Sequence, residues 1–141
     1  MTRFAPVVAR ALLGALFLVS GLNKLVPFMP MPPMPPEAGA FIGALVSTGY
    51  FLPFLAVIEV AAGALLLAGR FVPLALVVLA PIVVHVALFH LRLAPNVGIV
   101  AFVLAAELYL AWTYRSAYAP MLRARPVRVE ERVAQALPRA A

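Results

Sequence analysis

The sequence contains no cysteine and no aspartate, and only 11% of its 141 residues are charged. Without cysteine, the chain has no disulfide, no thiol redox pair and no thiolate metal site. An ordinary soluble domain is about 45–50% apolar and about 25% charged, whereas this chain is 65% apolar with a mean hydropathy of +1.06. A small soluble domain must cover its large surface with polar residues, and disorder requires low hydrophobicity. The composition therefore favours an integral membrane protein.

The charges are unevenly distributed along the chain. Eleven basic residues against five acids, all glutamate, give a net charge of +6. Most of the basic excess lies outside the apolar segments, with six arginines between Arg115 and Arg139. This pattern is typical of residues that anchor a protein to anionic lipid and set its topology. It argues against nucleic acid as the partner and for the lipid bilayer.

Hydropathy and proline positions predict an all-α, four-helix bundle in residues 1–115. A membrane-crossing helix needs about 20 mostly apolar residues, and Pro6, Pro53, Pro73 and Pro95 each lie near an expected helix start, where a missing N–H costs little. The four expected spans are residues 6–26, 51–68, 71–91 and 96–114. The long connection, residues 27–48, begins with a proline-rich stretch that should be extended and stiff.

The distribution of arginine and lysine predicts the orientation of this bundle. With both termini in the cytoplasm, Arg10, Arg70 and the arginines of the tail lie inside, and only Lys24 and Arg92 lie outside. This arrangement satisfies the positive-inside rule. The basic tail, residues 116–141, has apolar residues at helical spacing near Val129. It is either a short amphipathic helix on the membrane or a solvated terminus.

A few polar residues within the apolar segments are the candidate binding or ion-pair residues. A charge near the bilayer centre costs about 2.5–3.5 kcal/mol on insertion scales, so such groups usually face the bundle interior and find partners. Depths counted at about 1.5 Å per residue place them in the outer half of the membrane or near its midplane, and predict a shared polar pocket beneath the proline-rich loop. These residues are Asn23, Lys24, Glu59, His85 and Glu107.

Lys24 and Glu59 are expected to contact each other, because the long lysine stem can reach inward from its helix end. Gly14, Gly21 and Gly63 are expected to let the first two spans approach closely. The pair has two interpretations. It is either a clamp that fixes helix register or part of a binding or proton site.

The remaining candidates do not complete a catalytic or metal site. His85 is a packing histidine or, less favoured, a haem or metal ligand, because nothing else in the sequence completes such a site. For Glu107, an interhelical hydrogen bond and a functional role are equally favoured. Tyr118 and the aromatic residues before it are expected to form an interfacial belt. No phosphate loop, metal motif or nucleophile elbow is present, so we assign no catalytic residue.

At these residues the chain resembles the DoxX family of small bacterial and archaeal four-helix membrane proteins. The resemblance covers about residues 5 to 115. It is carried by Arg10-Ala-Leu-Leu-Gly14, by Ser20-Gly21-Leu22-Asn23-Lys24-Leu25, and by Glu59-Val-Ala-Ala-Gly63 continuing to Gly69-Arg70. Lys24 and Glu59 map onto the recurrent charged positions of the family.

The resemblance implies a multi-pass protein of the bacterial inner membrane that is linked to quinone-dependent redox complexes. Two hypotheses follow. The chain is an accessory subunit of a membrane redox assembly without activity of its own, or a small carrier or lipid/quinone-binding protein that uses the polar pocket itself. A quinone is compatible with both hypotheses, and so is a homo-oligomer.

Overall fold

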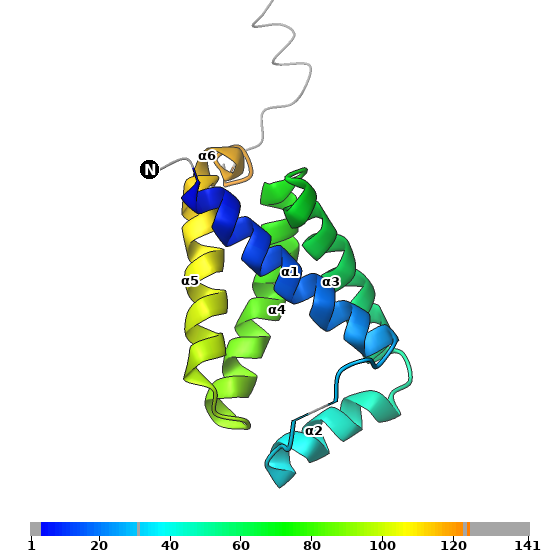
Figure 1. Ribbon diagram of the computed structural model, residues 1–141. Coiled ribbons are helices and arrows are strands. Elements are labelled where there is room, and N and C mark those ends of the chain that lie inside the picture. The colour runs from blue at the N-terminus through cyan, green and yellow to red at the C-terminus, as the bar shows by residue number, and fades with distance from the viewer. Residues whose placement is uncertain (1–3, 31, 123, 125–141) are drawn as a thin grey trace, which may run out of the picture.

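The computed structural model describes residues 4–30, 32–122 and 124, and every regular element in these residues is a helix. The helices succeed one another along the chain without a strand between them (Figure 1). They are α1 (Ala5–Leu25), α2 (Pro36–Ser47), α3 (Phe51–Ala68), α4 (Val72–Arg92), α5 (Val97–Thr113) and α6 (Arg115–Tyr118). The all-helical prediction is therefore confirmed for these residues. The tail helix expected near Val129 lies outside them.

Three of the helices, α1, α3 and α4, are long and apolar enough to cross a membrane. The fourth long helix, α5, has 17 residues and is also apolar. Since about 20 residues are typical of a span, the structure supports three span candidates and one shorter apolar helix. All four begin and end within one residue of the expected ranges.

The helix ends follow from local sequence signals. Proline occupies the first turn of α1, α2 and α4, where its missing N–H leaves no intrahelical bond unmade. Gly69 ends α3 with φ = +68°, a left-handed conformation that glycine adopts without steric cost. The chain then enters α4 at once, so α3 and α4 form a tight helical hairpin.

The start of α5 depends on a side-chain cap. The Asn96 Oδ1 accepts a hydrogen bond from the Ile99 backbone N–H at 3.2 Å. Replacing Asn96 by alanine is expected to lower the free energy of unfolding by about 1 kcal/mol, because one amide at the helix start loses its partner. Urea or SDS unfolding in detergent micelles, followed by circular dichroism, measures the change. Asn96→Asp is the control and should retain wild-type stability.

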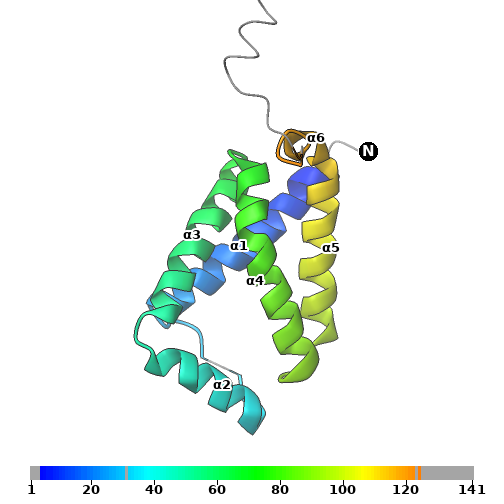
Figure 2. The same cartoon turned by 180° about the vertical axis from the view of Figure 1, so that it is seen from behind.

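Two helix pairs make the bundle. The closest packing is between α1 and α3, and the second pair is α4 with α5. In Figures 1 and 2 α1 runs obliquely across the bundle between α3 and α5. The start of α1, the α3–α4 turn and α6 lie at one end of the molecule. The proline-rich segment, α2 and the α4–α5 turn lie at the other (Figure 1).

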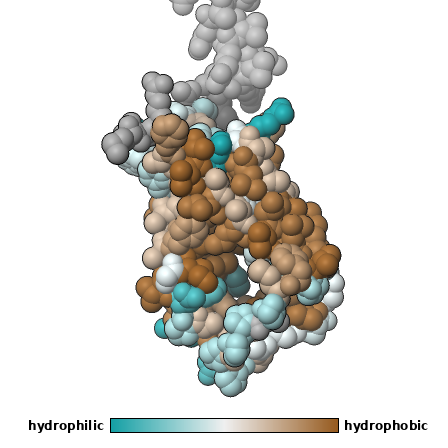
Figure 3. All heavy atoms as spheres, viewed as in Figure 1, coloured by the Kyte–Doolittle hydropathy of each residue, from teal (hydrophilic) through white to brown (hydrophobic). Residues whose placement is uncertain are grey.

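The interior of the bundle is apolar, and so is most of its exterior. Fully buried side chains include Leu13, Phe17, Leu66, Leu79 and Val103. Other large hydrophobic side chains are exposed, among them several on α1 and α4. In Figure 3 hydrophobic residues cover most of the visible face, and hydrophilic colours gather near the end that holds α2. An apolar exterior of this extent is typical of a surface in contact with lipid.

Candidate functional site: a buried ion pair and a separate carboxylate groove

Lys24 and Glu59 form an ion pair between α1 and α3. The distance from Lys24 Nζ to Glu59 Oε2 is 2.6 Å, and Lys24 Nζ also donates to Ser20 Oγ at 2.7 Å. The Glu59 side chain is 2% exposed, whereas that of Lys24 is 25% exposed. The ammonium group therefore reaches from the helix end toward a carboxylate that has no access to water.

Three glycines bring the two helix backbones close enough for this contact. A Cβ atom at Gly63 would lie 2.7 Å from both Gly14 O and Leu18 N, and one at Gly21 would lie 2.8 Å from Ala56 O. Real Cβ atoms do not approach backbone atoms this closely, so only glycine fits. The close approach sets the register that places Lys24 over Glu59, as expected for small residues in membrane helix contacts.

The charges of Lys24 and Glu59 neutralise each other in this ion pair. A buried ion pair is retained at low cost only when additional hydrogen bonds complete it, and Ser20 provides one. Asn23 is also occupied, because its Oδ1 accepts hydrogen bonds from the Phe28 and Met29 backbone N–H groups at 2.9 and 2.7 Å. Asn23 thus secures the start of the proline-rich segment.

His85 lies apart from the pair, on the exposed side of α4 that faces α2. Its ring centroid is 5.8 Å from that of Phe41, and Phe41 is 6.0 Å from Phe89. His90 Nδ1 lies 2.9 Å from the Val86 carbonyl oxygen. Among the described residues, no group of three His, Cys, Asp or Glu side chains could hold a metal ion.

Glu107 occupies a groove between α4 and α5. Glu107 is only 7% exposed, and its buried Oε2 has no hydrogen-bond partner among the residues that the structure describes. The groove has a volume of about 460 Å³. Its lining residues are Leu76, Val77, Ala80, Glu107, Ala111, Tyr118, Met121 and Leu122.

Tyr118, which was expected only in the interfacial aromatic belt, reaches this groove from α6. Its hydroxyl donates to the Pro73 carbonyl oxygen at 3.3 Å, which ties the end of the bundle to the start of α4. Burial, and then the charges of Glu107 and Tyr114, raise the pKa of Tyr118 above its ordinary value of 10.0. Sequence spacing offered no signal for this contact, because 45 residues separate the two partners.

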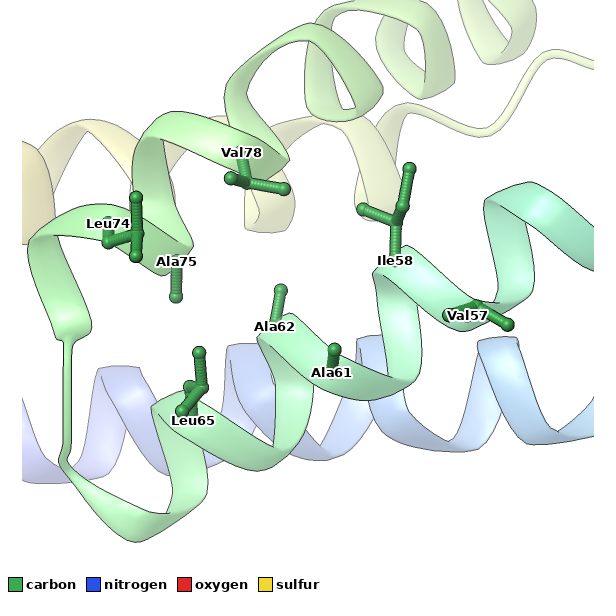
Figure 4. Close-up of a pocket in the computed structure, with 8 residues that line it drawn as sticks. All are labelled: Val57, Ile58, Ala61, Ala62, Leu65, Leu74, Ala75 and Val78. Carbon is green, nitrogen blue, oxygen red and sulfur yellow. The ribbon is translucent and has the colours of Figure 1, made fainter.

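A second groove lies between α3 and α4 and is lined by apolar side chains alone (Figure 4). Its volume is about 260 Å³. Ala61, Ala62 and Ala75 contribute small side chains there, so the two helices leave space that larger residues would fill. Without a polar group, this groove can hold only hydrocarbon.

The candidate polar residues therefore lie in three separate places in the structure. Lys24 and Glu59 meet between α1 and α3, His85 faces α2, and Glu107 lies in the groove between α4 and α5. No hydrogen bond or ion pair among the described side chains joins these three places, and neither groove includes Lys24, Glu59 or His85.

Comparison with known proteins gives one family. The family model described as DoxX matches residues 5–92, which include α1 to α4 and both members of the ion pair. The chain belongs to the DoxX family. The match ends at Arg92, so α5 and Glu107 lie beyond it, although the resemblance was expected to reach residue 115. No curated protein and no solved structure shows a significant match to this DoxX protein.

Proposed function

We propose that this DoxX-family membrane protein is an accessory, quinone-linked subunit of a membrane redox assembly. The observation that carries the proposal is the ion pair. Within the matched range, Lys24 donates hydrogen bonds to both Glu59 and Ser20, so the lysine and the glutamate are used to hold α1 on α3. A subunit of this kind supports an assembly by shape and apolar surface, and the chemistry belongs to its partner.

The proposed membrane arrangement has four spans with both termini in the cytoplasm of a bacterial inner membrane. The end that carries α6 and the start of α1 holds Arg10, Arg70 and Arg115, and the opposite end holds Lys24 and Arg92. Further arginines follow in the tail sequence. The positive-inside rule places the more basic end in the cytoplasm. The shorter α5 crosses as the fourth span with local thinning of the bilayer.

A quinone fits the groove beside Glu107 in volume and polarity. Apolar side chains of α4 and residues 121–122 would hold an isoprenoid tail, and Glu107 and Tyr118 would contact the headgroup. When bound, such a molecule supplies the electron carrier of the assembly. The residues of this chain bind and orient it.

Affinity purification tests the accessory role. The tagged full-length chain, extracted from its native membrane in a mild detergent, is expected to retain a redox enzyme subunit at near-stoichiometric amounts, together with quinone. Mass spectrometry of proteins and lipids provides the measurement. A monomer or homo-oligomer that carries neither quinone nor a redox protein would contradict the proposal.

A second candidate function is a small carrier or lipid/quinone-binding protein acting alone. It is favoured by Glu107, whose Oε2 finds no partner in the described part of the chain. The two functions differ in what Glu59 does, because only the carrier hypothesis gives the ion pair a part in binding. If Glu59→Gln lowers stability and leaves ligand binding and cellular function intact, the ion pair is a clamp and this candidate, as a site that includes Glu59, fails.

A further inference from the structure

The turn between α3 and α4 holds a guanidinium group that lacks a partner in the described part of the chain. Arg10 of α1 lies against Gly69, since a Cβ atom there would lie 2.8 Å from Arg10 Cζ and closer still to Nη1. Arg10 Nε is buried without a hydrogen-bond partner among the described residues, and no ion pair of Arg10 is found there. Arg10 as a whole is only half-buried. A ligand would therefore meet the terminal nitrogens of the guanidinium fork, which carry four of its five N–H donors.

A second arginine belongs to the same turn. Arg70 follows Gly69 directly and is exposed. No carboxylate among the described residues pairs with either arginine. Glu59 is bound to a lysine, Glu37 belongs to α2 at the opposite end, and Glu107 lines the α4–α5 groove. The turn thus presents two cationic side chains that no described carboxylate neutralises.

The all-apolar groove between α3 and α4 begins at this turn. In Figure 4 Leu65 and Leu74 lie beside the turn, and Val57, Ile58 and Val78 line the groove further along the two helices. Val57 and Leu74 are 59% and 56% exposed, so the groove opens onto the apolar exterior. Its volume of about 260 Å³ is below the range of about 300–1,000 Å³ for sites that enclose a whole small molecule. The groove therefore fits a length of hydrocarbon chain.

We propose that an anionic phospholipid binds at this turn, with its phosphate on Arg10 and Arg70 and one acyl chain in the α3–α4 groove. The planar fork of arginine matches the oxygen atoms of a phosphate group. Basic pockets between membrane helices on the cytoplasmic side are typical sites for anionic headgroups. This lipid site is separate from the groove at Glu107, and it does not require a redox partner.

The position of Arg10 along α1 supports a headgroup at this height. Since α1 begins at Ala5, Arg10 lies about 7.5 Å along the helix from its start. Its long side chain reaches the α3–α4 turn, as expected for an arginine that brings its charge to the membrane surface. The guanidinium therefore lies at the mouth of the groove, where the phosphate of a lipid meets its acyl chains.

The charge at the turn favours a lipid over a second protein helix. A helix in the groove would cover its apolar walls but would leave two arginines without an anion. A phospholipid supplies both parts in one molecule, because its phosphate is directly linked to its acyl chains. The apolar groove and the basic turn therefore have one common occupant.

Native mass spectrometry of the full-length protein in a mild detergent tests the lipid site. Phosphatidylglycerol and phosphatidylcholine with identical acyl chains are titrated separately, and the lipid-bound fraction gives each dissociation constant. The wild type is expected to bind phosphatidylglycerol about tenfold more tightly, because two arginines attract its net negative charge. In phosphatidylcholine the choline group offsets the charge of the phosphate.

The arginine variants locate the headgroup. Arg10→Gln and Arg70→Gln are each expected to weaken phosphatidylglycerol binding about threefold, and the double variant should bind the two lipids equally. Arg70 is exposed, so Arg70→Gln reports on the site in folded protein even where Arg10→Gln loses stability. Arg115→Gln removes an arginine of the same end outside the turn. It is the matched control and should keep the tenfold preference.

A groove variant locates the acyl chain. Ala61→Leu fills the α3–α4 groove and is expected to weaken the binding of both lipids about threefold, because the chain loses its contacts with the groove walls. The preference for phosphatidylglycerol should persist. Ala105→Leu is the matched control, since Ala105 is exposed on α5 and lines neither groove. It should bind both lipids like the wild type.

Four results would overturn the lipid site. Two are equal binding of both lipids by the wild type and unchanged phosphatidylglycerol binding by the double arginine variant in folded protein. The third is displacement of the lipid by equimolar glycerol phosphate, which would make the ligand a free phosphate. The fourth is a wild-type dimer that Ala61→Leu converts to a monomer, which would make the occupant a second copy of the chain.

Failure of the lipid site is distinguishable from failure of the redox assembly. Phosphatidylglycerol binding that depends on Arg10 and Arg70, in a protein that retains no redox partner on purification, would support the lipid site and remove the accessory role. A retained redox partner together with equal binding of the two lipids would do the reverse.

Discussion

Lys24→Met is expected to lower the free energy of unfolding by about 3–5 kcal/mol. The substitution keeps an unbranched side chain that is one atom shorter, but it removes the only ion-pair partner found for Glu59 among the described residues. Glu59 is 2% exposed and cannot reach water without separating α1 from α3. SDS unfolding in mixed micelles, followed by circular dichroism, gives the free energy.

The opposite substitution, Glu59→Leu, is expected to cost less, about 1–3 kcal/mol. Lys24 is 25% exposed and can turn its ammonium group toward the membrane surface once its partner is gone. The double variant Lys24→Met/Glu59→Leu should return to within about 1 kcal/mol of the wild type, because an apolar pair of similar volume replaces a buried ion pair without loss in many proteins.

These three variants distinguish the two interpretations of the ion pair, a structural clamp and a binding site. A clamp requires that the single variants lose stability and that the double variant regains both stability and function. A double variant that folds normally but loses ligand binding or its partner would assign Lys24 and Glu59 to a binding site instead. Equal stability of Lys24→Met and the wild type would show that the pair does not hold the helices together.

Gly63→Leu is expected to lower the free energy of unfolding by about 3 kcal/mol or more. The first atom of any side chain at this position would lie 2.7 Å from Gly14 O and from Leu18 N. Both are backbone atoms, so no rotamer change relieves the clash and the helices must separate. Separation would also lengthen the Lys24–Glu59 contact, which adds to the loss.

Gly43→Leu is the matched control for this substitution. Gly43 also lies within a helix, α2, but a Cβ atom there meets nothing within 4 Å. Leucine is a better helix former than glycine by somewhat under 1 kcal/mol, so the control should leave stability unchanged or raise it slightly. Similar losses in both variants would contradict the role of Gly63 as a packing contact, and circular dichroism in micelles compares them directly.

The helices themselves could be predicted because their signals are local. Apolar run length identified the long helices, and the prolines and Gly69 marked where they begin or end. The Lys24–Glu59 contact was also predictable, since two opposite charges and three glycines on two adjacent spans leave few ways to pack. The resemblance to the DoxX family rested on the same residues, and the family match covers them.

The separation of the polar residues into three places in the structure could not be predicted in the same way. Counting depth along each helix places Glu59, His85 and Glu107 at heights compatible with one pocket, but height does not give rotation about the helix axis. In a soluble helix the polar face marks the outside. Helices α3 and α5 are apolar on every side apart from one glutamate each, so no polar face shows which side meets a neighbour.

The sequence by itself thus determined a helical membrane protein of the DoxX family, the ends of its helices and the charged residues that need partners. These properties depend on composition and on short-range spacing. Only the tertiary structure decided which neighbour each polar group meets. The glycine contacts of α1 with α3 fix the rotation that turns Glu59 toward Lys24. The α4–α5 packing and the return of Tyr118 leave Glu107 in a groove, without a hydrogen-bond partner for its Oε2 among the described residues.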